Sequence, residues 1–144
     1  MINHAQTNYH FHHTVVTEAH PASIWKIWTD VAGWKKWDSG LKDAILNEPF
    51  GEGAKGKLIP DKGPKSKFVV SEYYEGVGYT FKTRIPLGWL KVKRYLTSEG
   101  NQTSFTHEVT FTGLLRNPLG NSIGKRYRAM LPEVMNNIKT LAEN

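Results

Sequence analysis

Arg94 and His107 are the two residues whose types and spacing offer the clearest chemistry in this 144-residue sequence. They fall on two predicted strands, 89–97 and 103–112, which a hairpin at 99–102 joins. With Ser98 opposite Thr103, Arg94 faces His107 across the pair. The same register puts three apolar pairs on that side, namely Leu90 with Phe111, Val92 with Val109 and Leu96 with Phe105. Lys93 and Glu108 pair on the other side, so one register yields an apolar face and a polar face.

A charged side chain on a buried face is costly unless it is paired or solvated. A ligand pocket with a few convergent polar groups would explain this pair. Arg94 would then hold a carboxylate or enolate, and His107 would donate to a carbonyl or move a proton. Alternatively, Arg94 extends to the open end of the sheet and His107 bonds a neighbour. No catalytic residue is assigned, and a cavity-facing pair predicts a lowered pKa for His107.

Large apolar side chains on the predicted inner faces are candidates for a cavity wall. Together with Arg94 and His107, the candidate ligand-binding residues are Phe68, Val70, Tyr79, Phe81, Phe111, Tyr127 and Met130. We expect a cavity of at least ~300 Å³ between the sheet and the last helix, the low end for small-molecule pockets. The alternative is that these side chains fill a closed core. Which of Glu72 and Tyr73 faces inward is also open.

Metal and phosphate sites are weakly indicated. His10 and His12 share a strand face, as metal ligands can, but no cysteine and no nearby acidic cluster support them. Surface or partly buried histidines are favoured, and we expect neither a metal nor a cofactor. The glycines of segment 51–56 lack the Gly-Lys-Ser/Thr ending of a phosphate loop and lead into a strand.

The elements that must position these residues follow from periodicity. A strand at 9–19 precedes a helix that begins at Pro21 and a second short helix that holds Trp34 and Trp37. Strands follow at 42–47, 54–59, 67–74 and 77–85, before the pair described above. A final helix carries an apolar stripe, with Pro132 expected to kink rather than end it. The stripe comprises Leu119, Ile123, Tyr127, Met130, Leu131, Val134, Ile138 and Leu141.

Three short motifs in the first third of the chain carry a family resemblance. They are Pro21-Ala22-Ser23-Ile24-Trp25, Trp28-Thr29-Asp30 and Trp34-Lys35-Lys36-Trp37. These resemble the opening of the START-like, polyketide cyclase/dehydrase group of the SRPBCC superfamily, and the element order matches from about Tyr9 to Glu143. The resemblance implies an α+β helix-grip fold, in which a curved antiparallel sheet of about seven strands wraps around a long C-terminal helix. It carries no residue-by-residue catalytic signature, because members bind lipids, sterols, hormones or polyketides and a minority are enzymes.

Composition limits the partners. The net charge is +6 with no cysteine, and no apolar stretch is long enough to suggest a signal peptide or a membrane span. Basic residues cluster at 55–67 and 116–128; because the aromatic residues fall mostly on apolar faces, we interpret both clusters as solvated surface. We therefore expect a cytoplasmic protein with no nucleic-acid partner and no stable membrane insertion. Its oligomeric state is open, with residues 1–8 flexible and 9–144 forming one domain.

Three functions remain. The first is binding of a mid-sized hydrophobic or aromatic small molecule, lipid- or polyketide-like, in an internal cavity. The second is a cyclase or dehydratase with His107 as acid/base and Arg94 as electrostatic stabiliser. The third is a protein-interaction module with a closed core. An internal cavity would distinguish the ligand-binding protein and the enzyme from the interaction module. Turnover of a substrate would then distinguish the enzyme from the ligand-binding protein.

Overall fold

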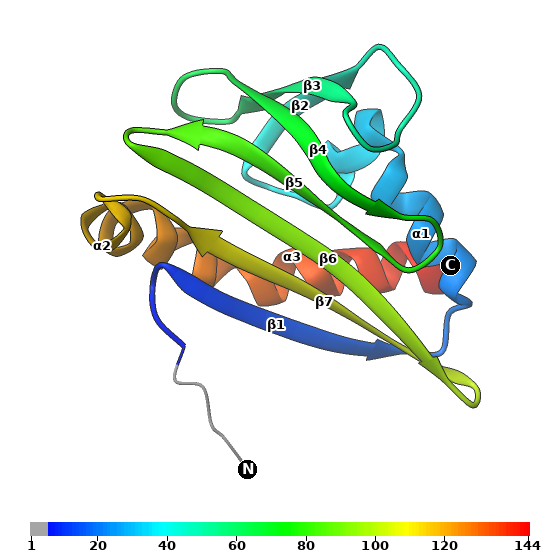
Figure 1. Ribbon diagram of the computed structural model, residues 1–144. Helices are drawn as coiled ribbons and strands as arrows, with labels where there is room; N and C mark the ends of the chain where they lie inside the picture. Colours follow the sequence, from blue (N-terminus) through cyan, green and yellow to red (C-terminus); the bar gives the residue numbers. More distant parts are fainter. Residues whose placement is uncertain (1–5) are drawn as a thin grey trace.

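A single antiparallel sheet of seven strands dominates the structure, a computed structural model that describes residues 6–144 (Figure 1). The strands are β1 (His10–Thr17), β2 (Leu41–Leu46), β3 (Lys55–Pro60), β4 (Ser66–Tyr74), β5 (Gly78–Ile85), β6 (Gly88–Glu99) and β7 (Gln102–Phe111). Their order across the sheet is β1-β7-β6-β5-β4-β3-β2, so β1 pairs with the last strand and every other pair is sequential.

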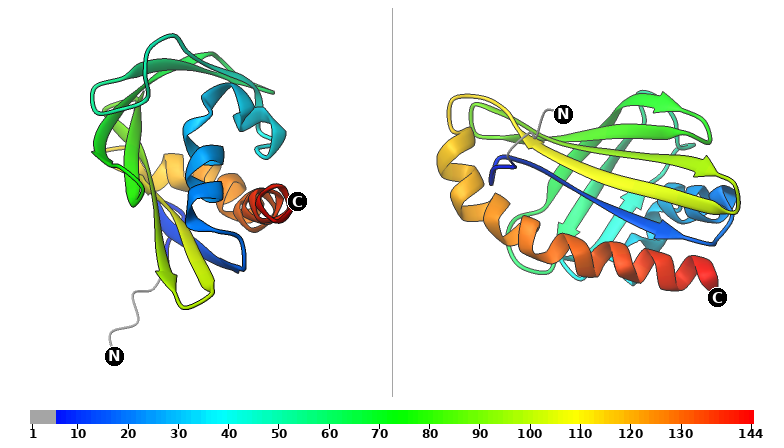
Figure 2. Two further views of the ribbon diagram at one scale, coloured as in Figure 1. Left: turned by 90° about the vertical axis from the view of Figure 1, so that its right-hand side faces the viewer. Right: turned by 90° about the horizontal axis from the view of Figure 1, so that it is seen from below.

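The helical segments lie on the concave side of this sheet. They are α1 (Pro21–Thr29), the 3₁₀ helix η1 (Val31–Lys36), α2 (Arg116–Leu119), the π-helical segment η2 (Gly120–Gly124) and α3 (Lys125–Glu143). Figure 2 shows the sheet curving around α1 and α3. This arrangement confirms the predicted helix-grip α+β fold.

Local sequence explains the start of α1. The His20 ring Nδ1 accepts the Ala22 N–H at 3.1 Å, and Pro21 occupies the first turn, where its missing N–H costs nothing. Ile24 and Trp28, four residues apart, are both fully buried against the sheet.

The register predicted for the last hairpin is confirmed. Arg94 pairs with His107, Val92 with Val109 and Lys93 with Glu108. In β4, a bulge between Val70 and Glu72 changes which residues face inward. Val70 faces inward before the bulge and Tyr73 faces inward after it. Of the two residues left open by the sequence, Tyr73 is therefore the inward one, and Glu72 faces outward.

The final helical run begins with two buried glycines that the predicted stripe does not include. Gly120 and Gly124 pack against Asn8 and Tyr9, just before β1. Ile123 of the stripe is 50% exposed, but it lines the cleft described below, as the stripe predicts. The π-helical turn, with its wider spacing, allows the glycines and Ile123 to face different neighbours. Pro132 lies inside α3 without ending it, as expected.

The predicted flexible N-terminus is described only in part. Residues 1–5 of that segment lie outside the described residues. Thr7 bridges to His10, and the Gln6 side chain accepts the His12 N–H at 2.9 Å, so both residues are hydrogen-bonded to the start of β1.

Candidate functional site

A cleft of about 250 Å³ lies between the concave face of the sheet and α3. Its walls come from η1 and the following turn, from the inner faces of β3, β5 and β6, and from the helical run after β7. The residues that matter most below are Trp34, Asp38, Phe81, Arg94, Tyr127 and Met130. The cleft is smaller than the ~300 Å³ expected. Trp34 and Trp37, supplied by η1, are almost fully buried and take up much of the concave side.

Arg94 is the buried cation of this cleft and is only 2% exposed, whereas Arg126, which also lines the cleft, is exposed. Its guanidinium carbon lies 4.7, 5.0 and 4.8 Å from the ring centres of Trp34, Trp37 and Phe81. Cation–π attraction of this kind partly replaces lost hydration. The protein therefore retains a full positive charge inside an aromatic cage.

The hydrogen bonds of Arg94 are incomplete. One guanidinium nitrogen, Nη1, donates to the Tyr79 hydroxyl at 2.7 Å, whereas the buried Nε has no partner. Within residues 6–144, the ion pairs closer than 4.0 Å are His10–Glu108 and Lys35–Asp43, so no carboxylate pairs with Arg94. A buried donor without an acceptor is costly, and an oxygen-bearing ligand would relieve that cost.

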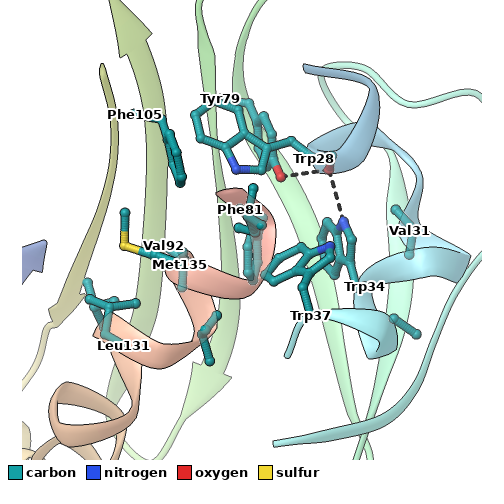
Figure 3. Close-up of a cluster of buried hydrophobic side chains, with 14 of the residues drawn as sticks. Trp28, Val31, Trp34, Trp37, Tyr79, Phe81, Val92, Phe105, Leu131 and Met135 are labelled. Atoms are coloured by element: carbon teal, nitrogen blue, oxygen red, sulfur yellow. Dashed lines mark hydrogen bonds between the residues drawn. The ribbon is translucent and has the colours of Figure 1, made fainter. Parts of the chain in front are cut away.

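The cage is held together through the end of α1 (Figure 3). The Trp28 carbonyl belongs to the last turn of that helix, where carbonyls lack helical partners. It accepts the Tyr79 hydroxyl and the Trp34 indole N–H, each at 2.9 Å. Tyr79 consequently accepts from Arg94 and donates to Trp28, which fixes the orientation of its hydroxyl.

His107 lies beside this network and away from the wall of the cleft. It is 1% exposed, and its Nε2 accepts the Trp28 indole N–H at 3.0 Å, which places the ring proton on Nδ1. Burial, with the charges of Arg94 and His13, holds its pKa well below the ordinary value of 6.5. The predicted direction is confirmed, but the structure does not bring this ring to the cleft.

The sequence reasoning missed two charged residues of the cleft, Asp38 and Arg126, and it did not single out Tyr127 as an ionisable group. Burial raises the pKa of Asp38, although the Gly40 N–H and the charge of Arg94 act the other way. Burial and the Asp38 charge raise the pKa of Tyr127 to about 12, so its phenol is protonated at neutral pH. Asp38 directly follows Trp37 in the sequence, and its position next to this buried tryptophan pair was the one signal that could have indicated a place in the cleft.

The structure brings together part of the predicted binding set. Arg94, Phe81, Tyr127 and Met130 line the cleft. The others, His107, Phe68, Val70, Tyr79 and Phe111, are buried but lie off its wall. They pack against other side chains, for example Phe68 against Trp34 with ring centres 5.5 Å apart. Alternation fixes which face a strand residue joins but not which inner-face residues meet a neighbour and which meet empty space.

A larger hollow, of about 580 Å³, lies on the opposite, outer face of the sheet. Four lysines and one arginine are among its eleven lining residues, and none of its polar residues is buried. The inner cleft combines apolar walls with a buried, under-bonded cation, which is the usual composition of a small-molecule site. We therefore place the candidate functional site at the inner cleft.

The weaker motifs assemble no further centre. The His10 Nε2 lies 2.7 Å from the Glu108 carboxylate at the surface. Across residues 6–144, no three His, Asp or Glu side chains gather as they would around a metal ion. In the same part of the chain, none of the helices has the length and apolar character needed to cross a bilayer.

Similar solved structures share the fold. A START superfamily protein from Mycobacterium smegmatis is 16% identical, with a TM-score of 0.70 over 93% of this chain and 97% of its own. A protein from Arthrobacter aurescens is 16% identical, with a TM-score of 0.71 over 94% and 87%. DynU16, from the dynemicin biosynthetic locus, is also 16% identical, with a TM-score of 0.72. The match covers 94% of this chain but only 48% of DynU16.

No curated protein sequence is significantly similar to this chain. The profile of one sequence family, described as polyketide cyclase / dehydrase and lipid transport, matches residues 9–143. That span includes every strand, every helix and the whole inner cleft. The chain therefore belongs to the polyketide cyclase/dehydrase and lipid transport family.

Proposed function

We propose that the protein binds a small to mid-sized hydrophobic or aromatic molecule in the inner cleft, with a carboxylate or carbonyl oxygen of that molecule at Arg94. The observation that carries the proposal is the buried guanidinium, which lines the cleft while its Nε lacks an acceptor. Apolar walls supply affinity through burial, and the cation selects the polar end. The family description, which includes lipid transport, agrees with a hydrophobic ligand.

The two alternatives fit less well. A cyclase or dehydratase that used His107 as acid/base would need that ring at the cleft, but its Nε2 is occupied by Trp28 and the ring lies off the wall. A closed-core interaction module would need no internal space, whereas a cleft is present. Binding without His107 chemistry is therefore the function that the arrangement favours.

The test compares matched ligands and matched variants. Native mass spectrometry of freshly purified protein identifies any co-purified molecule, and calorimetry then titrates 2-naphthoic acid and 2-naphthamide. Arg94→Met should weaken the acid by about 10- to 150-fold, which corresponds to 1.5–3 kcal/mol for a bond to a charged group. The amide should change far less. Arg84→Met, which removes a cation from the outer face, is the control. Equal losses for acid and amide would refute the role of Arg94.

A further inference from the structure

The outer face of the sheet carries an uncompensated row of positive charge. In neighbouring strands, Ile45 pairs with Lys57 and Lys57 with Lys67. Phe68 pairs with Thr83, which brings Lys67 level with Arg84, and Arg84 pairs with Trp89. The row thus crosses five strands, and three cations occupy successive positions in it.

A second row runs beside the first. Lys55 pairs with Val69, Val69 with Lys82, and Lys82 with Lys91. The outer hollow is the 580 Å³ space bounded by both rows, and the lining residues include five cations and no Asp or Glu. They are Lys55, Lys57, Lys67, Lys82 and Arg84.

Such a register is unfavourable for an isolated protein, because like charges directly opposite each other destabilise a sheet. The same face is compensated further along, where Lys93 pairs with Glu108 and Thr80 donates to the Glu72 carboxylate at 3.0 Å. Repulsion is therefore confined to the outer hollow. If these lysines served only to keep the surface soluble, we would expect them to be spread over the face and not gathered around a hollow.

The floor of the outer hollow is apolar, and one of its residues, Trp89, contacts two of the cations. Val69 lies between Lys55 and Lys82, while Ile45 and Trp89 stand at the two ends of the first row. Lys82 Nζ and the Arg84 guanidinium carbon lie 4.3 and 4.6 Å from the Trp89 ring centre. These cation–π contacts hold two of the charges beside the floor. A volume of about 580 Å³ falls within the range of small-molecule sites, roughly 300–1,000 Å³.

We propose that the outer hollow is a second binding site, for an organic phosphate that carries two or more negative charges. Its phosphate oxygens would contact Lys57, Lys67 and Arg84, and its organic part would lie over Val69 and Trp89. This site is separate from the inner cleft, since strand alternation places the two sets of residues on opposite faces of one sheet.

The test uses ATP, inorganic triphosphate and adenosine as probes in calorimetry of the full chain at low ionic strength. ATP should bind, triphosphate should bind more weakly, and adenosine should not bind. The double variant Lys57→Gln/Lys67→Gln should weaken ATP by about tenfold or more, as expected when charge-assisted bonds are lost. Its melting temperature should rise slightly, because the repulsion between the two lysines is gone.

Two controls decide the outcome. Lys26→Gln/Lys36→Gln makes the same change of net charge on exposed residues of α1 and η1, and it should leave ATP binding intact. An equal loss in this variant would reveal attraction to net charge and overturn the site. Arg94→Met should also leave ATP binding intact, which keeps a failure here distinct from a failure at the inner cleft. No ATP binding, or tighter and lysine-dependent binding of oligo-dT, would likewise refute the proposal.

Discussion

Arg94 carries a cost in folding stability. Its guanidinium lies among four aromatic rings and one of its nitrogens lacks a partner, and no carboxylate of residues 6–144 lies within 4.0 Å of it. Burial of such a group without compensation opposes folding. Arg94 lines the apolar cleft, and in that low-dielectric position its charge would attract an anionic ligand group more strongly than an exposed cation would.

The free energies of unfolding of two variants should therefore change in different ways. That of Arg94→Met should be no lower than that of wild type, because this variant removes a desolvated charge and retains much of the side-chain volume. Tyr79→Phe should lose about 1–3 kcal/mol, because it leaves Arg94 Nη1 without an acceptor and removes a donor from the Trp28 carbonyl. Urea denaturation checks both. A comparable loss in the two variants would contradict the account of Arg94.

A pH dependence follows from the buried ring of His107. Its pKa is lower in the folded state than the unfolded value of about 6.5. As pH falls, the unfolded chain takes up a proton that the folded chain resists. The stability linked to neutral His107 is thus complete above pH ~6.5 and is lost as pH falls toward the folded pKa, at up to about 1.4 kcal/mol per pH unit.

The variant His107→Gln isolates this effect, because an amide oxygen can still accept the Trp28 N–H without titrating in this range. Urea unfolding at a series of pH values should show wild type losing stability relative to this variant on acidification. His12→Gln, on the exposed side of β1, controls for the loss of a histidine. Parallel pH profiles for wild type and His107→Gln would rule out a neutral, buried His107.

At the scale of elements, the approach of the last helical run to the segment just before β1 depends on glycine. A Cβ on Gly124 would overlap the Asn8 carbonyl oxygen and meet the Phe111 ring at 3.0 Å, and one on Gly120 would lie 2.9 Å from Tyr9 Cβ. The π-helical turn presents these two glycines to the strand edge. Helix and sheet can therefore pack closely at the end of the molecule where the helical run begins.

Gly124→Ala should accordingly destabilise the protein by about 1–3 kcal/mol, the usual cost of overpacking, even though alanine favours helix. Gly51→Ala is the control, because no atom lies within 4 Å of its added Cβ. Thermal unfolding of the two variants gives the comparison. A Gly124→Ala protein as stable as wild type would mean that this turn is not in close contact with Asn8 and Phe111.

Over the whole molecule, one sheet separates two environments. The concave face holds aromatic side chains around one buried cation, whereas the outer face carries most of its charges in two basic rows. The net charge of +6 is therefore not spread evenly over the molecule, since five of the cations line the outer hollow. Pairing of β1 with β7 joins the first strand in the chain to the last one and completes the curved sheet.

The amino-acid sequence alone determined the order of elements and the register of the last hairpin. Both follow from local periodicity and turn residues, and the pairing of Arg94 with His107 followed from that register. Only the tertiary structure decided the rest. The β4 bulge put Tyr73 inside, the π-helical turn placed Gly120 and Gly124 against the segment before β1, and Trp34 and Trp37 reduced the cleft. Asp38 joined the cleft while His107 did not, because whether an inner-face side chain meets a neighbour or a space depends on how distant elements pack.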